Sequence, residues 1–193
     1  MASLTLSKGN NLSLTKADPG LQMAMVGLGW DPRTTSGHQF DLDASALLVT
    51  ASGKVRNNDD FIFYNQLESK DGSVVHQGDN RTGLGDGDDE QILINLATVS
   101  PDIARVVIVV SIDQAEARRQ NFGQVRDAYC RVVNQENDAE IVRYDLSEDA
   151  ASETTMVFCE IYRNGAEWKF RAVGQGYASG LYGIATDYGI VLD

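Results

Sequence analysis

Apolar and polar residues alternate in short runs along most of this chain. The six residues 40–45, Phe-Asp-Leu-Asp-Ala-Ser, alternate strictly, which is the two-residue period of a β-strand with one buried face. Turn pairs such as Asp71-Gly72 and Asn164-Gly165 separate the runs. The pattern predicts strands at residues 4–6, 12–14, 23–28, 40–49, 61–64, 74–77, 91–96, 105–112, 128–134, 140–145, 155–163 and 168–173. We therefore expect a mainly β fold, a sandwich of two antiparallel sheets.

Helical patterns are scarce, so we expect only a few short peripheral helices. Residues 114–120 (Gln-Ala-Glu-Ala-Arg-Arg-Gln) favour a helix, with Asp113 as a candidate N-cap. Residues 178–188 predict a second helix that closes one end of the sandwich. Its apolar face consists of Leu181, Ile184, Ala185 and Tyr188.

The length and composition indicate one domain over residues 1–193. The chain has 193 residues, of which 42% are hydrophobic, and this is enough apolar material for a single core. We see no low-complexity linker and no repeat of fixed period. The two cysteines, Cys130 and Cys159, each lie in an apolar context, so we expect buried free thiols rather than a disulfide.

The charge of the chain argues against some partners. The formal net charge is −12, and binding to nucleic acid or an anionic membrane requires clustered Lys and Arg. The longest apolar run, residues 106–110, is too short for a membrane-spanning helix of about 20 residues. The N-terminal residues lack the apolar stretch of a signal peptide, so we expect a cytoplasmic protein without membrane insertion.

Acidic residues are concentrated between residues 79 and 90. This segment has five acidic side chains, one asparagine and one arginine, with three glycines between them. Such a crowd of like charges needs screening, and Ca²⁺ takes six to eight oxygen ligands. The oxygen donors of the segment are Asp79, Asn80, Asp86, Asp88, Asp89 and Glu90. With the acids upstream, there are enough candidate ligands for two ions.

Three upstream aspartates are further candidates. Asp41 and Asp43 share one face of their predicted strand, about 7 Å apart, and Asp31 follows another strand. Each has an ordinary alternative, because Asp41 and Asp43 could lie on a solvated face and Asp31 in a turn. The pairing with the acidic segment favours a metal site, since neither segment carries a balancing lysine.

Other chemistries fit less well. The acidic segment does not follow the EF-hand pattern, because Arg81 and Leu84 stand where an oxygen ligand and a glycine are required. His38, His76 and the two cysteines are too far apart in sequence for a typical zinc motif. A Gly-x-Ser-x-Gly nucleophile motif is absent from the sequence.

Several motifs together resemble the TerD/TerE family of tellurite-resistance proteins. They are Val26-Gly27-Leu28-Gly29-Trp30-Asp31, Phe40-Asp41-Leu42-Asp43-Ala44-Ser45, the segment 78–90, Phe61-Ile62-Phe63-Tyr64-Asn65, and the residues 117–123, 143–149 and 167–176. The resemblance implies a calcium-binding β-sandwich without enzymatic activity, acting in bacterial stress responses and tellurite resistance, with other proteins of that system as candidate partners. The ligands it implies are Asp41, Asp43, Asp79, Asn80, Asp86, Asp88 and Glu90.

Two alternatives remain open at this point. The metal could orient a small ligand, such as a nucleotide or a carbohydrate. Alternatively, the chain could be a scaffold that docks onto partner proteins through Arg118 and Arg119 and an acidic face.

Overall fold

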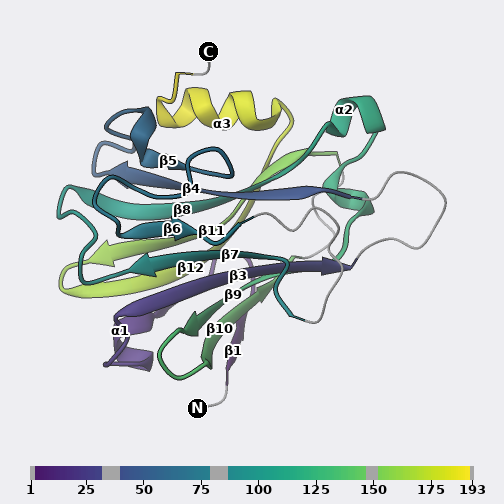
Figure 1. Cartoon of the computed structure of the whole chain (residues 1–193). Helices are drawn as coiled ribbons and strands as arrows, with labels where there is room; N and C mark the ends of the chain where they lie inside the picture. The colour runs from purple at the N-terminus through teal and green to yellow at the C-terminus, as the bar shows by residue number, and fades with distance from the viewer. Residues whose placement is uncertain (1–2, 32–39, 79–86, 147–151, 192–193) are drawn as a thin grey trace.

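Two six-stranded sheets face each other in the computed structural model, which describes residues 3–31, 40–78, 87–146 and 152–191 (Figure 1). The first sheet has the order β1 (Leu4–Leu6), β10 (Ala139–Asp145), β9 (Arg126–Asn134), β3 (Met23–Asp31), β7 (Glu90–Asn95), β6 (Val74–His76). The second has the order β2 (Asn11–Ser13), β12 (Glu167–Tyr177), β11 (Thr155–Asn164), β8 (Ile103–Ile112), β4 (Leu42–Thr50), β5 (Phe61–Ile62). The predicted β-sandwich is confirmed.

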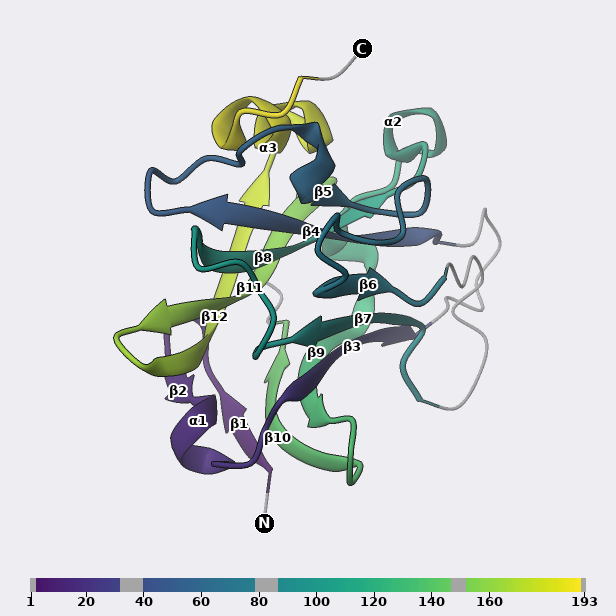
Figure 2. The ribbon, with the colours of Figure 1, turned by 60° about the vertical axis from the view of Figure 1, so that its left-hand side comes forward.

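One strand pairing departs from the antiparallel expectation. Within the described residues, β1 runs parallel to β10, whereas every other neighbouring pair of strands is antiparallel. Figure 2 shows the N-terminal segment with β1 beside β10 and β2 beside β12. The first strands of the chain thus form an edge of each sheet.

The second sheet is apolar on both faces, and this explains the position of the longest helix. In β8, Val106, Ile108 and Val110 pack into the core between the sheets, while Val107 and Val109 pack into a separate cluster on the outer face. Helix α3 (Gly180–Tyr188) covers that outer cluster (Figure 1). The prediction that this helix closes an end of the sandwich was wrong, because the exposed apolar surface lies on the face of the sheet.

The remaining helices are short. They are α1 (Leu14–Ala17), the 3-10 helices η1 (Asn58–Asp60) and η2 (Phe122–Gln124), and α2 (Ala115–Arg118). Leu14, expected in a strand, begins α1 because the Ser13 side chain accepts a hydrogen bond from the Lys16 amide. Helix α2 begins after Gln114, which adopts a left-handed conformation, so Asp113 is not its N-cap.

The strand expected at residues 61–64 is shorter in the structure. Only Phe61 and Ile62 form β5, and Phe63 instead makes an isolated bridge with Gln66. A tight turn that returns the chain after two residues explains the early end of the strand.

Candidate metal centre

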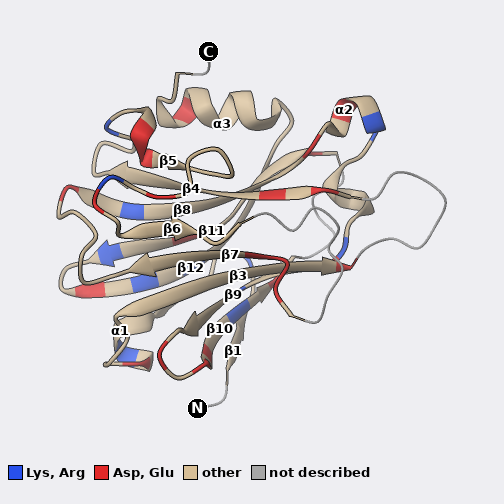
Figure 3. Ribbon diagram, in the orientation of Figure 1, with Lys and Arg blue, Asp and Glu red and all other residues tan. Residues whose placement is uncertain are grey.

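The described candidate acidic residues lie at or beside strand ends, at one end of the sandwich. Asp31 ends β3, Asp43 lies at the start of β4, and Glu90 begins β7. In the register of the first sheet Leu28 pairs with Glu90, which brings the end of β3 next to the start of β7. In Figure 3 the ribbon is red, the colour of Asp and Glu, at these strand ends. We call Asp31, Asp41, Asp43, Asp88, Asp89 and Glu90 the acidic end.

Asp88 is held by an arginine that the sequence did not point to. Arg131 donates from Nε to Asp88 Oδ1 at 2.8 Å and from Nη2 to Oδ2 at 3.1 Å, and the Tyr129 hydroxyl donates to Oδ1 at 3.0 Å. The Asp88 side chain is fully buried in this arrangement. Hydrogen bonding to Asp88 raises the pKa of Arg131, while burial and the Asp88 charge raise the pKa of Tyr129 to about 12.

A close approach of backbone and side chain makes this pairing possible. Gly27 and Arg131 are partners in the β3–β9 register, so they share the outer face of the first sheet. A Cβ on Gly27 would lie 2.0 Å from Asp88 Oδ2, which only glycine avoids. The balancing cation thus comes from β9, about 40 residues away from the acidic segment in sequence.

Asp89 lies among like charges. Its Oδ2 accepts a hydrogen bond from the Trp30 amide at 3.0 Å, and its own amide donates to the Leu28 carbonyl at 2.7 Å. Burial raises the pKa of Asp89, and the negative charges of Asp88, Glu90 and Asp31 raise it further. A cation at this position would relieve that repulsion.

Glu90 faces the core beside a histidine that bridges the two sheets. His76 Nε2 lies 3.1 Å from the Ala44 carbonyl and 3.2 Å from Glu90 Oε2. His76 Nδ1 accepts a hydrogen bond from the Gly78 amide at 3.1 Å, which indicates the neutral tautomer with hydrogen on Nε2. The sequence suggested His76 only as a zinc ligand that does not fit a typical motif. Its contact with β4 could not be predicted, because that contact depends on the packing of the two sheets.

The strand containing Asp43 alternates as predicted. Leu42 and Ala44 lie in the core, whereas Asp43 and Ser45 line a pocket on the outer face of the second sheet. Asp41 precedes this strand and is buried, and its carbonyl accepts a hydrogen bond from the Asp113 amide at 2.8 Å. Asp41 is therefore part of the packed structure rather than a solvated surface.

Several predicted ligands cannot be placed. Asp79, Asn80 and Asp86 lie outside the described residues. Within the described part of the chain, no three His, Cys, Asp or Glu side chains lie together as a metal-binding group. The carboxylates of Asp31, Asp89 and Glu90 have the hard-oxygen chemistry that suits Ca²⁺, whereas both oxygens of Asp88 already accept from Arg131.

Comparison with known proteins identifies the family. The family model described as the TerD domain matches residues 1–188. The chain belongs to the TerD domain family. A tellurium resistance protein TerD from Serratia marcescens is 58% identical over 188 residues, covering 97% of this chain and 98% of the relative. The general stress protein 16U of Bacillus subtilis (strain 168) is 52% identical over 189 residues, covering 97% and 98%.

A solved TerD-family structure supports the fold. The crystal structure of a homologue of the telluride resistance protein TerD from Streptomyces coelicolor A3(2) has a TM-score of 0.69 to this chain. It is 26% identical and covers 86% of this chain and 96% of that structure. Among the described residues of this TerD-domain protein, no helix is both long enough and apolar enough to cross a membrane.

Proposed function

We propose that this TerD-domain protein is a non-catalytic calcium-binding protein of the bacterial stress response that contributes to tellurium resistance in the cytoplasm. The names of its relatives, which refer to tellurium resistance and general stress, support the biological role. The environment of Asp89 is the observation that carries the calcium proposal. This partly buried carboxylate has three acidic neighbours that raise its pKa.

We assign the candidate ligands to two groups. Asp31, Asp41, Asp43, Asp89 and Glu90 come from the ends of β3, β4 and β7, and they would supply carboxylate oxygens to Ca²⁺. The remaining candidates, Asp79, Asn80 and Asp86, belong to the segment that precedes β7 in sequence. The number of donors suits two ions. Asp88 would instead anchor the segment through Arg131.

The bound calcium would supply charge neutralisation and a link between segments of the chain. It would join the acidic segment to strands of both sheets, so that the ion stabilises the sandwich. Other proteins of the tellurite-resistance system are the proposed partners of the loaded form. The docking alternative through Arg118 gains no support, because Arg118 Nη2 lies 3.3 Å from Asp113 Oδ2 and is thus engaged within its own chain.

Titration of Ca²⁺ into chelator-treated protein tests the proposal. Calorimetry should return up to two sites, and free Ca²⁺ at about 100 times Kd should add about 2.7 kcal/mol of stability. For a chain of this size that is a rise in Tm of roughly 5–10 °C. Mg²⁺ should give a smaller rise, because it demands a tighter octahedral shell.

Two variants and a matched control sharpen the test. Asp89→Asn combined with Glu90→Gln should remove most of the Ca²⁺-dependent rise in Tm. Glu136→Gln, at an exposed position in the β9–β10 turn, should leave it unchanged. A chain whose Tm does not respond to Ca²⁺, or a double variant that responds like the unaltered protein, would exclude calcium binding at the acidic end.

A further inference from the structure

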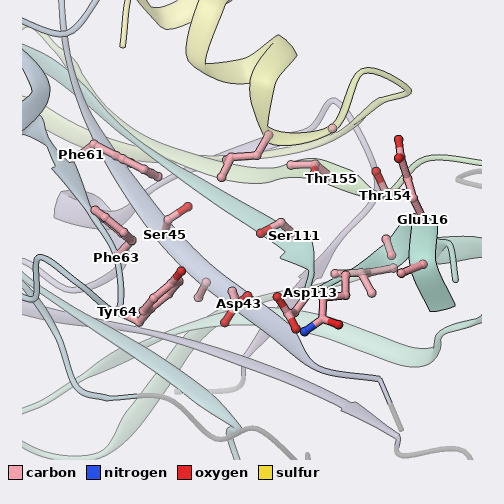
Figure 4. A pocket seen from close by; sticks show the side chains of 17 residues that line it. Asp43, Ser45, Phe61, Phe63, Tyr64, Ser111, Asp113, Glu116, Thr154 and Thr155 are labelled. Carbon is pink, nitrogen blue, oxygen red and sulfur yellow. The ribbon is translucent and has the colours of Figure 1, made fainter. Parts of the chain in front are cut away.

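A pocket of about 500 Å³ lies on the outer face of the second sheet, outside the contacts described for Asp88, Asp89 and Glu90. Under α3 this face is apolar, with Leu47, Val107 and Val109 in one buried cluster. Nearer the acidic end the same face becomes polar, and Leu181, in the first turn of α3, lines the pocket. The helix therefore covers only the apolar part of the face (Figure 4).

The floor of the pocket is a row of polar side chains across three strands. Asp43 of β4 pairs with Ser111 of β8, and Ser111 pairs with Thr155 of β11. Residues that are direct partners across a sheet point to the same face. Figure 4 shows these three side chains from neighbouring strands around one pocket.

Thr155 places a hydroxyl at this floor. Its side chain lines the pocket although the residue is only 2% exposed. Within the described part of the chain, its hydroxyl makes no hydrogen bond with another protein group, and its Oγ1 is not among the fully buried polar atoms that lack a partner, so the oxygen reaches the open pocket. The hydroxyl can therefore exchange a hydrogen bond with a polar group of a bound molecule.

One wall of the pocket is aromatic. The rings of Phe61 and Phe63 are stacked, with centroids 4.6 Å apart and an interplanar angle of 13°. Tyr64 meets Phe63 edge-on at 5.3 Å and is 52% exposed. Such a wall offers π-faces to a flat apolar group or to a cation.

The charge around the pocket selects the sign of the ligand. Asp43, Asp113 and Glu116 are among its lining residues, and no Lys, Arg or His of the described chain lines it. Arg118 offsets part of this charge through its ion pair with Asp113. The first turn of α3 adds only about half a positive charge. The net charge of the residues around the pocket is therefore negative, which disfavours binding of phosphates, nucleotides and oxyanions.

We propose that this pocket binds a small organic cation with a flat apolar body. The flat body lies against Phe61 and Phe63, the cationic group faces Asp113 and Glu116, and the Thr155 hydroxyl accepts a hydrogen bond from it. The volume is in the range of small-ligand sites. This inference goes beyond the proposed function, because its ligand is an organic cation held by Asp113, Glu116 and the aromatic wall. Among the described residues, Asp43 at the floor is the one that it shares with the proposed calcium ligands.

Three probes of nearly equal shape test the sign of the charge. Benzamidine is an aryl cation, benzamide its neutral analogue and benzoate the anion. Titrated into Ca²⁺-saturated protein and into chelator-treated protein, benzamidine should bind at least tenfold more tightly than benzamide, and benzoate should not bind. Amide chemical shifts of Ser111 and Thr155 should move on addition of benzamidine in both samples.

Variants of the pocket separate this site from general acidity. Glu116→Gln combined with Asp113→Asn should weaken benzamidine binding on the order of tenfold, and Thr155→Val should weaken it several-fold. The exposed Glu136→Gln should change nothing, and Tm should confirm that each variant is folded. Equal binding of benzamide and benzamidine, shifts confined to residues 88–90, or no loss in the double variant would overturn the proposal. Calcium titration of the same variants reports separately on the metal centre.

Discussion

Single residues decide how the acidic segment is attached to the first sheet. Gly27 leaves space for the Asp88 carboxylate, and Gly29 leaves space for the Tyr129 ring, which would lie 2.5 Å from an added Cβ. Arg131 then binds both Asp88 oxygens and also reaches Glu140 Oε2 at 3.0 Å. This network fixes Asp88 against the first sheet, and it thereby also places the adjacent residues 89 and 90.

Loss of the Arg131 guanidinium should be severe. Arg131→Met leaves the fully buried Asp88 carboxylate without its cation, which should lower the free energy of unfolding by about 3–5 kcal/mol. Urea denaturation in chelator measures this. Asp88→Asn in the same chain should recover most of the loss, because no charge then remains buried.

A surface ion pair provides the comparison for Arg131. Lys16 Nζ lies 2.7 Å from Glu167 Oε1, and the Lys16 side chain is 73% exposed. Lys16→Met should therefore cost less than about 1 kcal/mol. Similar losses for Lys16→Met and Arg131→Met would contradict the role given to the buried pair.

Asp71 should make stability depend on pH. Burial alone would raise its pKa, but hydrogen bonds from the hydroxyls of Ser73 and Ser69 and from backbone amides outweigh burial and lower it. A carboxylate with a lowered pKa in the folded protein stabilises it above the ordinary pKa of the unfolded chain, near 3.8. This stabilisation is lost as the pH falls through the folded-state pKa.

Asp71→Asn tests this dependence. At pH 7 the variant should be less stable by about 0.5–1 kcal/mol, since charged hydrogen bonds are lost at a largely exposed site. The difference should vanish at pH values below the folded-state pKa, where Asp71 is protonated and resembles asparagine. Chemical denaturation across the pH range measures it, and a constant difference would contradict the assignment.

At the scale of elements, α3 is a third layer of the fold. Ile184 and Ala185 are buried against the outer face of the second sheet, together with Leu47, Val49 and Val157. The helix ends at Gly189, whose left-handed conformation, φ 79°, closes the last turn. The layer covers apolar strand surface that water would otherwise reach.

Truncation of the buried face of α3 should reduce stability. Ile184 is 1% exposed, so Ile184→Ala should cost about 2–4 kcal/mol. Tyr182 on the same helix is 70% exposed, and Tyr182→Ala should change stability by less than about 0.5 kcal/mol. Thermal unfolding of both variants checks whether the helix depends on this one face.

The local sequence pattern predicts where the strands lie and which face of each strand is buried. It does not predict which strands are neighbours in a sheet. Alternation correctly put Asp43 and Ser45 on the face opposite Leu42 and Ala44. The predicted apolar face of residues 178–188 is also correct. The surface on which this face packs could not be predicted without knowing that the strands of the second sheet are apolar on both sides. Which strands pair depends on contacts distant in sequence.

The acidic residues at the ends of β3, β4 and β7 stood out by composition, but among the described residues no three of these carboxylates lie together as a metal-binding group. The metal site therefore stays a prediction. The partnership of Asp88 with Arg131 and the row from Asp43 through Ser111 to Thr155 both depend on register across strands. A single sequence carries no local signal for such register.

For the whole molecule, the two sheets meet through a core that contains both cysteines. Cys130 lies in β9 of the first sheet and Cys159 in β11 of the second, and both are free and buried, as predicted. Burial raises the pKa of the Cys159 thiol well above its ordinary value, and a hydrogen bond with Cys130 raises it further. Both conditions disfavour the reactive thiolate.

Thiol reactivity should therefore report on opening of the entire sandwich. An aromatic disulfide reagent should modify neither cysteine on mixing with the folded protein, and both in strong denaturant. In intermediate denaturant the rates at the two positions should rise together, because exposure of either requires the sheets to separate. Rapid modification of one cysteine in the native protein would show that the core opens locally.

The two edge strands β1 and β2 also constrain the order in which the polypeptide folds during its synthesis. β1 can pair only after β10 exists, and β2 only after β12 has been synthesised. On the ribosome, the segments of β1 and β2 therefore stay without these partners until β10 and β12 have emerged. Pairing of these two edge strands consequently follows the synthesis of their partners, and until then their backbone groups remain available to chaperones that bind emerging chains.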